Sequence, residues 1–198
     1  WVREFLRRNP DGLVVHIGCG LDTRFERVDN GRVQWFDLDL PIVMDLRTKL
    51  LRHENPRYHA LSASIFDDTW HEEIDRCGPR PKMFVAEGVL PYFHESEIKN
   101  LFLKLRDRFP GAELVCDAQS PFIIWADNLH LAASGVSARL HWGLRNPKDV
   151  ESWGQGLRLI EEFYYYENDD PAMKPFRWVR YIPGMARSAG IYRYQLGA

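Results

Sequence analysis

The chain has 198 residues, of which 45% are hydrophobic and 27% charged, and its formal net charge is −2. This length and composition suit one globular domain with its own core, and the nearly balanced charge argues against a nucleic-acid partner. No apolar run reaches the roughly 20 residues that a membrane-spanning helix needs. The three cysteines are too scattered for a disulfide framework or a metal site. We therefore expect a cytoplasmic single-domain protein with no membrane association and no metal.

The first 120 residues contain short apolar runs that alternate with segments of helical periodicity. Strands are expected at residues 13–17, 33–36, 58–64, 82–86 and 113–117. Helices are expected near the N-terminus, after a glycine loop, from Pro41 onward, and at residues 70–77 and 98–109. The helix from Pro41 should turn Val43, Leu46 and Leu50 toward the core. This alternation predicts parallel strands joined by right-handed crossovers, with helices on both faces of the sheet.

The last third of the sequence has a different character. Residues 121–155 are irregular and aromatic, which favours a cap over a pocket, and residues 157–166 and 190–196 are expected to be two closing strands, antiparallel at the sheet edge. The prediction is an α/β fold with a doubly wound, mostly parallel seven-stranded sheet, an antiparallel edge strand and a helical cap. Residues 13–120 would form its cofactor-binding half, and residues 156–198 its closing strands.

A glycine loop and two acidic residues mark the expected ligand site. Gly18 and Gly20 directly follow the first strand, and Asp39 comes nineteen residues after Gly20, close to the spacing at which an acid receives ribose hydroxyls. The third glycine of a dinucleotide-binding loop is replaced by Thr23, which makes a pyrophosphate ligand less favourable. Glu87 ends the fourth strand, where a carboxylate suits the amino group and sulfonium of S-adenosyl-L-methionine.

Four segments together resemble the leucine carboxyl methyltransferase family. They are the run from Gly18 to Arg24, residues 35–41, residues 63–67 with Trp70, and residues 86–92. The resemblance is greater to the bacterial branch of the family, which includes the tetracenomycin polyketide-synthesis O-methyltransferase. It implies a class I methyltransferase sheet, S-adenosyl-L-methionine as cofactor and S-adenosyl-L-homocysteine as product.

The resemblance also implies roles for individual residues. Gly18 and Gly20 would pass under the cofactor, Asp39 would hold the ribose, and Glu87 would take the amino group. The adenine would be flanked by Ser64, Ile65 and Phe66.

The sequence departs from the family pattern in two places. His16 stands two residues before the first glycine, where many methyltransferases have an acid. An arginine from a preceding N-terminal helix usually meets the methionine carboxylate of the cofactor. The sequence begins at Trp1 inside an amphipathic segment, so we expect that an N-terminal segment is missing. Either cofactor binding is weakened, or Arg24 substitutes in part for that arginine.

The transfer step needs few catalytic side chains. Methyl transfer from a sulfonium is an in-line displacement, so the enzyme mainly aligns the reacting atoms and excludes water. We expect Tyr92 to position the acceptor. A carboxylate acceptor is already ionised at neutral pH, whereas a phenol would benefit from a base, for which His130 and His141 are candidates.

The predicted function is O-methylation of a hydroxyl or carboxylate oxygen, with a small polyketide-like or aromatic metabolite as acceptor. One alternative acceptor is the C-terminal carboxylate of a protein. A second alternative is an NAD-dependent oxidoreductase, which would share Gly18, Gly20 and Asp39 but leaves Glu87 unexplained. A third is a methyltransferase-like binding module without activity. The sequence gives no indication of the oligomeric state.

Overall fold

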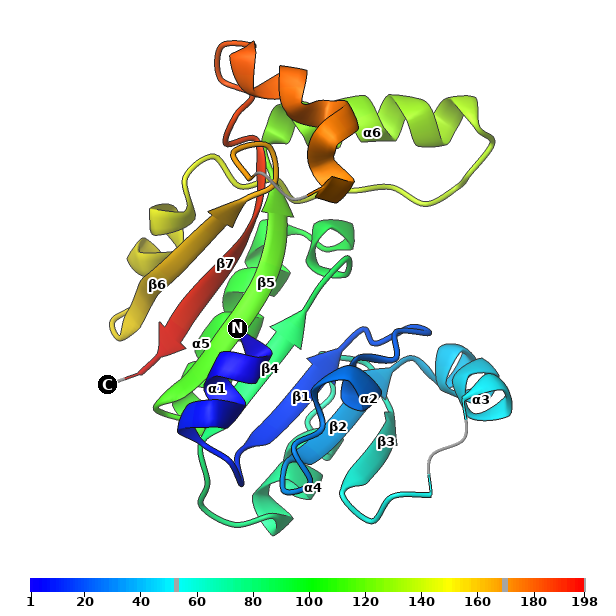
Figure 1. Ribbon diagram of the computed structural model, residues 1–198, viewed down its shortest axis with the longest axis vertical. Helices are drawn as coiled ribbons and strands as arrows, with labels where there is room; N and C mark the ends of the chain where they lie inside the picture. The colour runs from blue at the N-terminus through cyan, green and yellow to red at the C-terminus, as the bar shows by residue number, and fades with distance from the viewer. Residues whose placement is uncertain (52–53, 169–170, 198) are drawn as a thin grey trace. The chain divides into compact units, whose positions relative to one another are not determined.

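A computed structural model describes residues 1–51, 54–168 and 171–197, and within them seven strands form one mixed sheet (Figure 1). The strands are β1 Leu13–Ile17, β2 Gln34–Asp39, β3 Tyr58–Ser62, β4 Lys82–Ala86, β5 Ala112–Gln119, β6 Leu157–Tyr164 and β7 Ala189–Leu196. Their order along the sheet is β3-β2-β1-β4-β5-β7-β6. β1 pairs in parallel with β2 and β4, whereas β6 and β7 are antiparallel. The predicted α/β fold with an antiparallel edge is confirmed.

Helices separate the strands in the expected order. The α-helices are α1 Val2–Arg8, α2 Arg24–Val28, α3 Pro41–Leu50, α4 Thr69–Arg76, α5 Glu95–Arg108 and α6 Pro121–Ala133. The residues that the structure describes also contain three 3₁₀ segments, η1 Leu90–Tyr92, η2 Pro147–Trp153 and η3 Pro171–Tyr181. The chain divides into two compact units, Trp1–Glu87 with Gly111–Leu114, and Gly88–Pro110 with Val115–Ala198.

In the first unit, helices cover both faces of the parallel strands. All five residues of β1 are buried, as expected for a strand with apolar layers on each side. Trp35 of β2 contacts Phe25 of α2, with ring centroids 6.0 Å apart. Phe84 of β4 contacts Trp70 of α4 at 6.3 Å, and the strand register places Phe84 in the same row as Phe36, the neighbour of Trp35. Because adjacent residues of a strand face opposite sides, α2 and α4 cover opposite faces.

The orientation of α3 differs from the prediction. Met44 and Arg47 are its buried residues, whereas Leu46 and Leu50 are 49% and 60% exposed. The apolar periodicity favoured the leucines as core residues, but Arg47 has a buried partner in Asp37 of β2. Because an ion pair inside the fold satisfies the guanidinium, the helix turns a charged side chain inward.

The second unit contains the antiparallel pair of strands β6 and β7 and an aromatic core. The ring of Phe102 on α5 lies 5.4 Å from Trp153 and 5.7 Å from Tyr194 of β7. The first part of the expected cap, which has no regular pattern in the sequence, is the 13-residue helix α6. Local residues cap the N-terminus of α6. The Ser120 side chain accepts a hydrogen bond from the amide of Ile123, and Pro121 in the first turn has no amide hydrogen that needs a partner.

Within the part of the chain that the structure describes, every helix is too short or too polar to cross a bilayer.

Candidate functional site

The glycine loop follows β1 and is tied to the end of β2. The amide of Gly18 donates to the carbonyl of Leu38 at 2.8 Å. Gly18 and Gly20 have φ values of 62° and 50°, in the left-handed region that favours glycine. A Cβ atom on Gly20 would meet nothing within 4 Å. The loop therefore presents bare backbone to open space, as a ligand passing close to the main chain requires.

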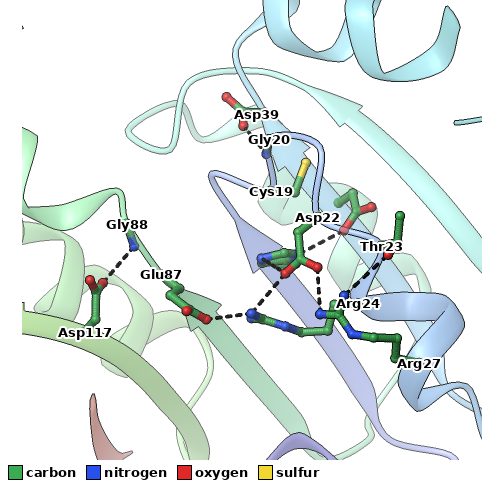
Figure 2. A network of polar contacts seen from close by, with 12 residues as sticks. Cys19, Gly20, Asp22, Thr23, Arg24, Arg27, Asp39, Glu87, Gly88 and Asp117 are labelled. Carbon is green, nitrogen blue, oxygen red and sulfur yellow. Dashed lines mark hydrogen bonds and ion pairs between the residues drawn. The ribbon is translucent and has the colours of Figure 1, made fainter. Parts of the chain in front are cut away.

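Asp39, the last residue of β2, holds this loop in place. Its Oδ2 accepts a hydrogen bond from the Gly20 amide at 2.8 Å, and its Oδ1 accepts one from the Leu40 amide at 2.7 Å. Each carboxylate oxygen has a further lone pair, so Asp39 can still accept hydrogen bonds from hydroxyl groups. The two sequence features singled out for one site, Gly20 and Asp39, are in direct contact (Figure 2).

A buried polar network lies beside the loop. Arg47 of α3 donates to the carbonyl of Gly20 at 2.9 Å and forms an ion pair with Asp37 of β2. Asp37 also accepts hydrogen bonds at 2.7 Å from the Tyr58 hydroxyl and from Nε1 of Trp35. Arg47 and Asp37 are each at most 1% exposed. The network connects the glycine loop to α3, β2 and β3.

These contacts decide the protonation of Asp37. Burial by itself raises the pKa of the Asp37 carboxyl, but the contacts with His16, Tyr58 and Trp35 and the charge of Arg47 outweigh it and hold the pKa below its usual value. Asp37 is therefore a carboxylate at neutral pH.

His16 is a buried residue of β1, two positions before the first glycine of the loop. The strand register pairs it with Asp37, and its Nδ1 lies 3.4 Å from Oδ1 of Asp37. Its Nε2 lies 3.9 Å from Oδ2 of Asp22 in the loop. The ring is only 2% exposed, so His16 packs between two carboxylates at the strand end.

Arg24, the first residue of α2, forms an ion pair with Glu87, which directly follows β4 (Figure 2). Nη2 of Arg24 lies 2.5 Å from Oε2 of Glu87 and 3.0 Å from Oδ2 of Asp22. Asp22 in turn accepts a hydrogen bond from Arg27 at 2.8 Å. The Arg24 side chain is 16% exposed and that of Glu87 is 48% exposed. The sequence analysis placed Glu87 at the amino group of the ligand and Arg24 at its carboxylate. In the structure, these two side chains bind each other.

The loop after β3 lies next to the end of β2. The Ala63 amide donates to the carbonyl of Asp39 at 3.1 Å. Ser64 is held by Asp67, whose Oδ2 accepts from the Ser64 amide at 2.9 Å. The Ile65 side chain is buried, whereas Ser64 and Phe66 are half-buried. These two side chains can present surface to a flat ring beside Asp39.

Of the three catalytic candidates in the second unit, Tyr92 and His141 lie on adjoining segments, whereas His130 lies on α6. Tyr92 lies on η1 and is 47% exposed. The His141 amide donates to the carbonyl of Pro91 at 2.7 Å, and the His141 ring lies 4.2 Å from that of His94, so this histidine adjoins the Tyr92 segment. His130 lies exposed on α6.

A groove of about 630 Å³ lies in the second unit beside α6. Its lining includes Ile124, Trp125, Asn128, Arg139, Leu140 and His141. Asn128 of α6 holds the segment that contains Leu140 against the helix. Its side chain accepts a hydrogen bond from the Leu140 amide at 2.9 Å and donates one to the Leu140 carbonyl at 2.8 Å. The volume of the groove lies within the range of small-molecule sites.

Gly88, the first residue of the second unit, is bound to another residue of that unit. The Gly88 amide donates to Oδ1 of Asp117 on β5 at 2.8 Å, and Gly88 has a φ of 71° (Figure 2). Only a residue without a Cβ adopts this conformation readily.

Sequence reasoning missed the network of Asp37, Arg47 and Tyr58. One available signal was Asp37 itself, an acid within an otherwise apolar strand, which requires a buried partner. Among residues 1–51, 54–168 and 171–197, no three His, Cys, Asp or Glu side chains are arranged to hold a metal ion.

Comparisons with known proteins match this chain to methyltransferases. The family model described as leucine carboxyl methyltransferase matches residues 2–106, which include the glycine loop, Asp39 and Glu87. The chain is 31% identical, over 98% of its length, to the tetracenomycin polyketide synthesis O-methyltransferase of Streptomyces glaucescens, of which it covers 73%.

Two further matches are more distant. The chain is 28% identical, over 81% of its length, to an S-adenosyl-L-methionine-dependent methyltransferase of Gibberella zeae, of which it covers 58%. The crystal structure of a presumed methyltransferase from Thermobifida fusca matches the whole chain with a TM-score of 0.69 at 18% identity, and 77% of that protein is covered. This last likeness concerns the fold alone.

Proposed function

Because the chain belongs to the leucine carboxyl methyltransferase family, we propose that it transfers the methyl group of S-adenosyl-L-methionine to an oxygen atom of a small acceptor. The observation that carries this proposal is the contact between the Gly20 amide and Asp39, with Glu87 at the end of the neighbouring strand β4. Ligands of α/β sheets bind beyond the carboxyl ends of such strands.

The residues present fit this cofactor. The bare backbone of Gly20 leaves room for a ligand, and Asp39 keeps acceptor capacity for the ribose hydroxyls. Ser64 and Phe66 offer half-buried surface for the adenine, next to the residue that would hold the ribose. Glu87 and Arg24 carry the charges that complement an amino group and a carboxylate. No phosphate cradle is needed, because this cofactor has no phosphate.

The bound cofactor supplies an electrophilic methyl group on a positively charged sulfur. The protein contributes alignment and exclusion of water, and no covalent step on a side chain is required. Tyr92 is proposed to position the acceptor oxygen. If the acceptor is a phenol, His141 is the stronger base candidate of the two histidines, because it adjoins the Tyr92 segment and lines the groove.

A small-molecule acceptor is favoured by two observations. The relative from Streptomyces glaucescens is a polyketide synthesis O-methyltransferase. The groove beside α6 combines the exposed ring of Trp125 with the cation of Arg139 and the ring of His141, a lining that suits a flat, partly polar molecule. The C-terminal carboxylate of a protein is the second candidate, because the matching family is described by leucine carboxyl methylation.

Calorimetric titration with S-adenosyl-L-homocysteine tests the cofactor assignment. Asp39→Ala and Glu87→Ala should each weaken binding by about 1–3 kcal/mol, because each leaves polar groups of the ligand unpaired. Asp11→Ala is a matched control, since Asp11 precedes the opposite end of β1.

Parallel titration with NAD tests the oxidoreductase alternative. Binding of NAD in place of S-adenosyl-L-homocysteine would overturn the proposal. Unchanged affinity in both acid variants would show that the site lies elsewhere.

A further inference from the structure

We propose that Arg24 and Glu87 give up their mutual ion pair when the cofactor binds, each taking one charged end of its amino-acid group. Glu87 receives the ammonium and Arg24 receives the carboxylate. This inference rests on the proposed cofactor and adds a selection device to it. A ligand must carry both charges to replace the pair without leaving either side chain unpartnered.

The geometry of the pair favours such an exchange. Arg24 approaches Glu87 through one nitrogen and one oxygen, Nη2 and Oε2, so the contact is monodentate. The pair is also partly open to solvent, since the Glu87 side chain is 48% exposed. Ion pairs in such positions are weak, so replacing this one costs little.

Asp22 keeps Arg24 at the site while Glu87 is released. Its Oδ2 lies 3.0 Å from Nη2 of Arg24, and its other oxygen is bound by Arg27 at 2.8 Å. Arg27 compensates the charge of Asp22, so Arg24 retains its attraction for a ligand carboxylate. A guanidinium has five N–H donors, and Arg24 can serve Asp22 and a carboxylate together.

Glu87 is held in place by the backbone on either side. Ala86, which precedes it, is a buried residue of β4, and the Gly88 amide that follows is bound to Asp117 at 2.8 Å. The carboxylate can therefore change partners without movement of the main chain. The exchange is a rearrangement of side chains at fixed strand ends.

Three ligands that differ in their ammonium and carboxylate groups test the contribution of each charge. S-adenosyl-L-homocysteine has both, its decarboxylated analogue keeps only the ammonium, and 5′-methylthioadenosine has neither. Calorimetry of all three is done with the unaltered chain, Arg24→Ala, Glu87→Gln and the control Arg32→Ala. The control removes an exposed arginine that precedes β2 and does not belong to the cluster of Asp22, Arg24 and Glu87.

Each variant has its own expected pattern. Arg24→Ala should weaken S-adenosyl-L-homocysteine tenfold or more, while the decarboxylated analogue binds equally or more tightly because Glu87 is already free. Glu87→Gln should weaken both of these ligands tenfold or more. Neither variant should change the affinity for 5′-methylthioadenosine more than about threefold, which also verifies that the variants fold. Arg32→Ala should leave all three affinities within the same range.

Three outcomes would overturn the exchange. If Arg24→Ala weakens all three ligands equally, Arg24 only braces the loop. If the unaltered chain binds the three ligands with equal affinity, the cofactor assignment stands but the ion pair takes no part. If it binds none of them, the proposed cofactor fails and the exchange fails with it.

Discussion

Single residues decide how the glycine loop is held. Arg47 reaches from α3 to the carbonyl of Gly20 and is compensated by Asp37, with both side chains buried. The Tyr58 hydroxyl bridges the pair, because it donates to Asp37 at 2.7 Å and accepts from Nε of Arg47 at 3.1 Å. Removing one member of a buried pair leaves the other as an uncompensated charge, which costs more than the pair itself contributes.

We predict that Arg47→Met lowers the free energy of unfolding by about 3–5 kcal/mol, because Asp37 would remain buried without its cation. Urea denaturation measures the loss. Arg57→Met is the matched control, since Arg57 pairs with Asp29 but both side chains are more than 20% exposed. That variant should lose at most about 1 kcal/mol. Similar losses in the two variants would contradict a special role for the Arg47 network.

At the scale of elements, α6 and residues 140–144 form one closely packed piece. Asn128 binds both backbone groups of Leu140, and the Leu144 amide donates to the carbonyl of Gln119 at 2.8 Å. A Cβ atom on Gly143 would lie 2.8 Å from Cα of Pro121 at the start of α6. Glycine is needed here for space, because the contact is with main-chain atoms that cannot rotate away.

Gly143→Ala should therefore destabilise the protein by about 1–3 kcal/mol, as overpacking in a well-packed region does. Chemical denaturation gives the value. Ser137→Ala changes an exposed residue between α6 and residues 140–144 and should stay within about 0.5 kcal/mol of the unaltered chain. A neutral Gly143→Ala variant would mean that the segment can move away from α6, and the groove would then not be preformed.

For the whole molecule, stability should depend on acid pH through Asp37. Its folded-state pKa is depressed, whereas an aspartate in the unfolded chain titrates near about 3.9. The Asp37 contribution is therefore fully present above about pH 4 and is lost as the pH falls through the folded-state pKa. Asp29 adds to this, because the hydrogen bond from Arg57 lowers its pKa as well.

Comparison with Asp37→Asn isolates this contribution. The unaltered chain should be the more stable of the two at pH 7, and the difference in unfolding free energy should shrink below about pH 4, since the asparagine does not titrate. Urea denaturation between pH 7 and pH 3 measures both proteins. A difference that is constant over this range would contradict the depressed pKa.

Local patterns in the sequence determined the alternation of strands and helices and the place of the glycine loop. Short apolar runs bounded by glycine and proline predicted β1, β2, β4 and β5 to within a few residues, because such signals act between chain neighbours. The positions of Asp39 and Glu87 at strand ends followed from the same patterns. The sequence predicted that Gly20 and Asp39 belong to one ligand site, but not the hydrogen bond between them.

Tertiary structure alone decided which polar side chains meet. Arg47 faces inward, although the apolar periodicity of α3 predicts another face, because its partner Asp37 lies on the adjacent strand β2. No local pattern in the sequence predicts that these two residues meet. Arg24 and Glu87, 63 residues apart, meet because β1 and β4 pair in register. Periodicity reports which face of an element is apolar, whereas the partner of a charge depends on the packing of distant elements. For that reason the sequence indicated the ligand and its loop, and the fold determined how the charges around them are paired.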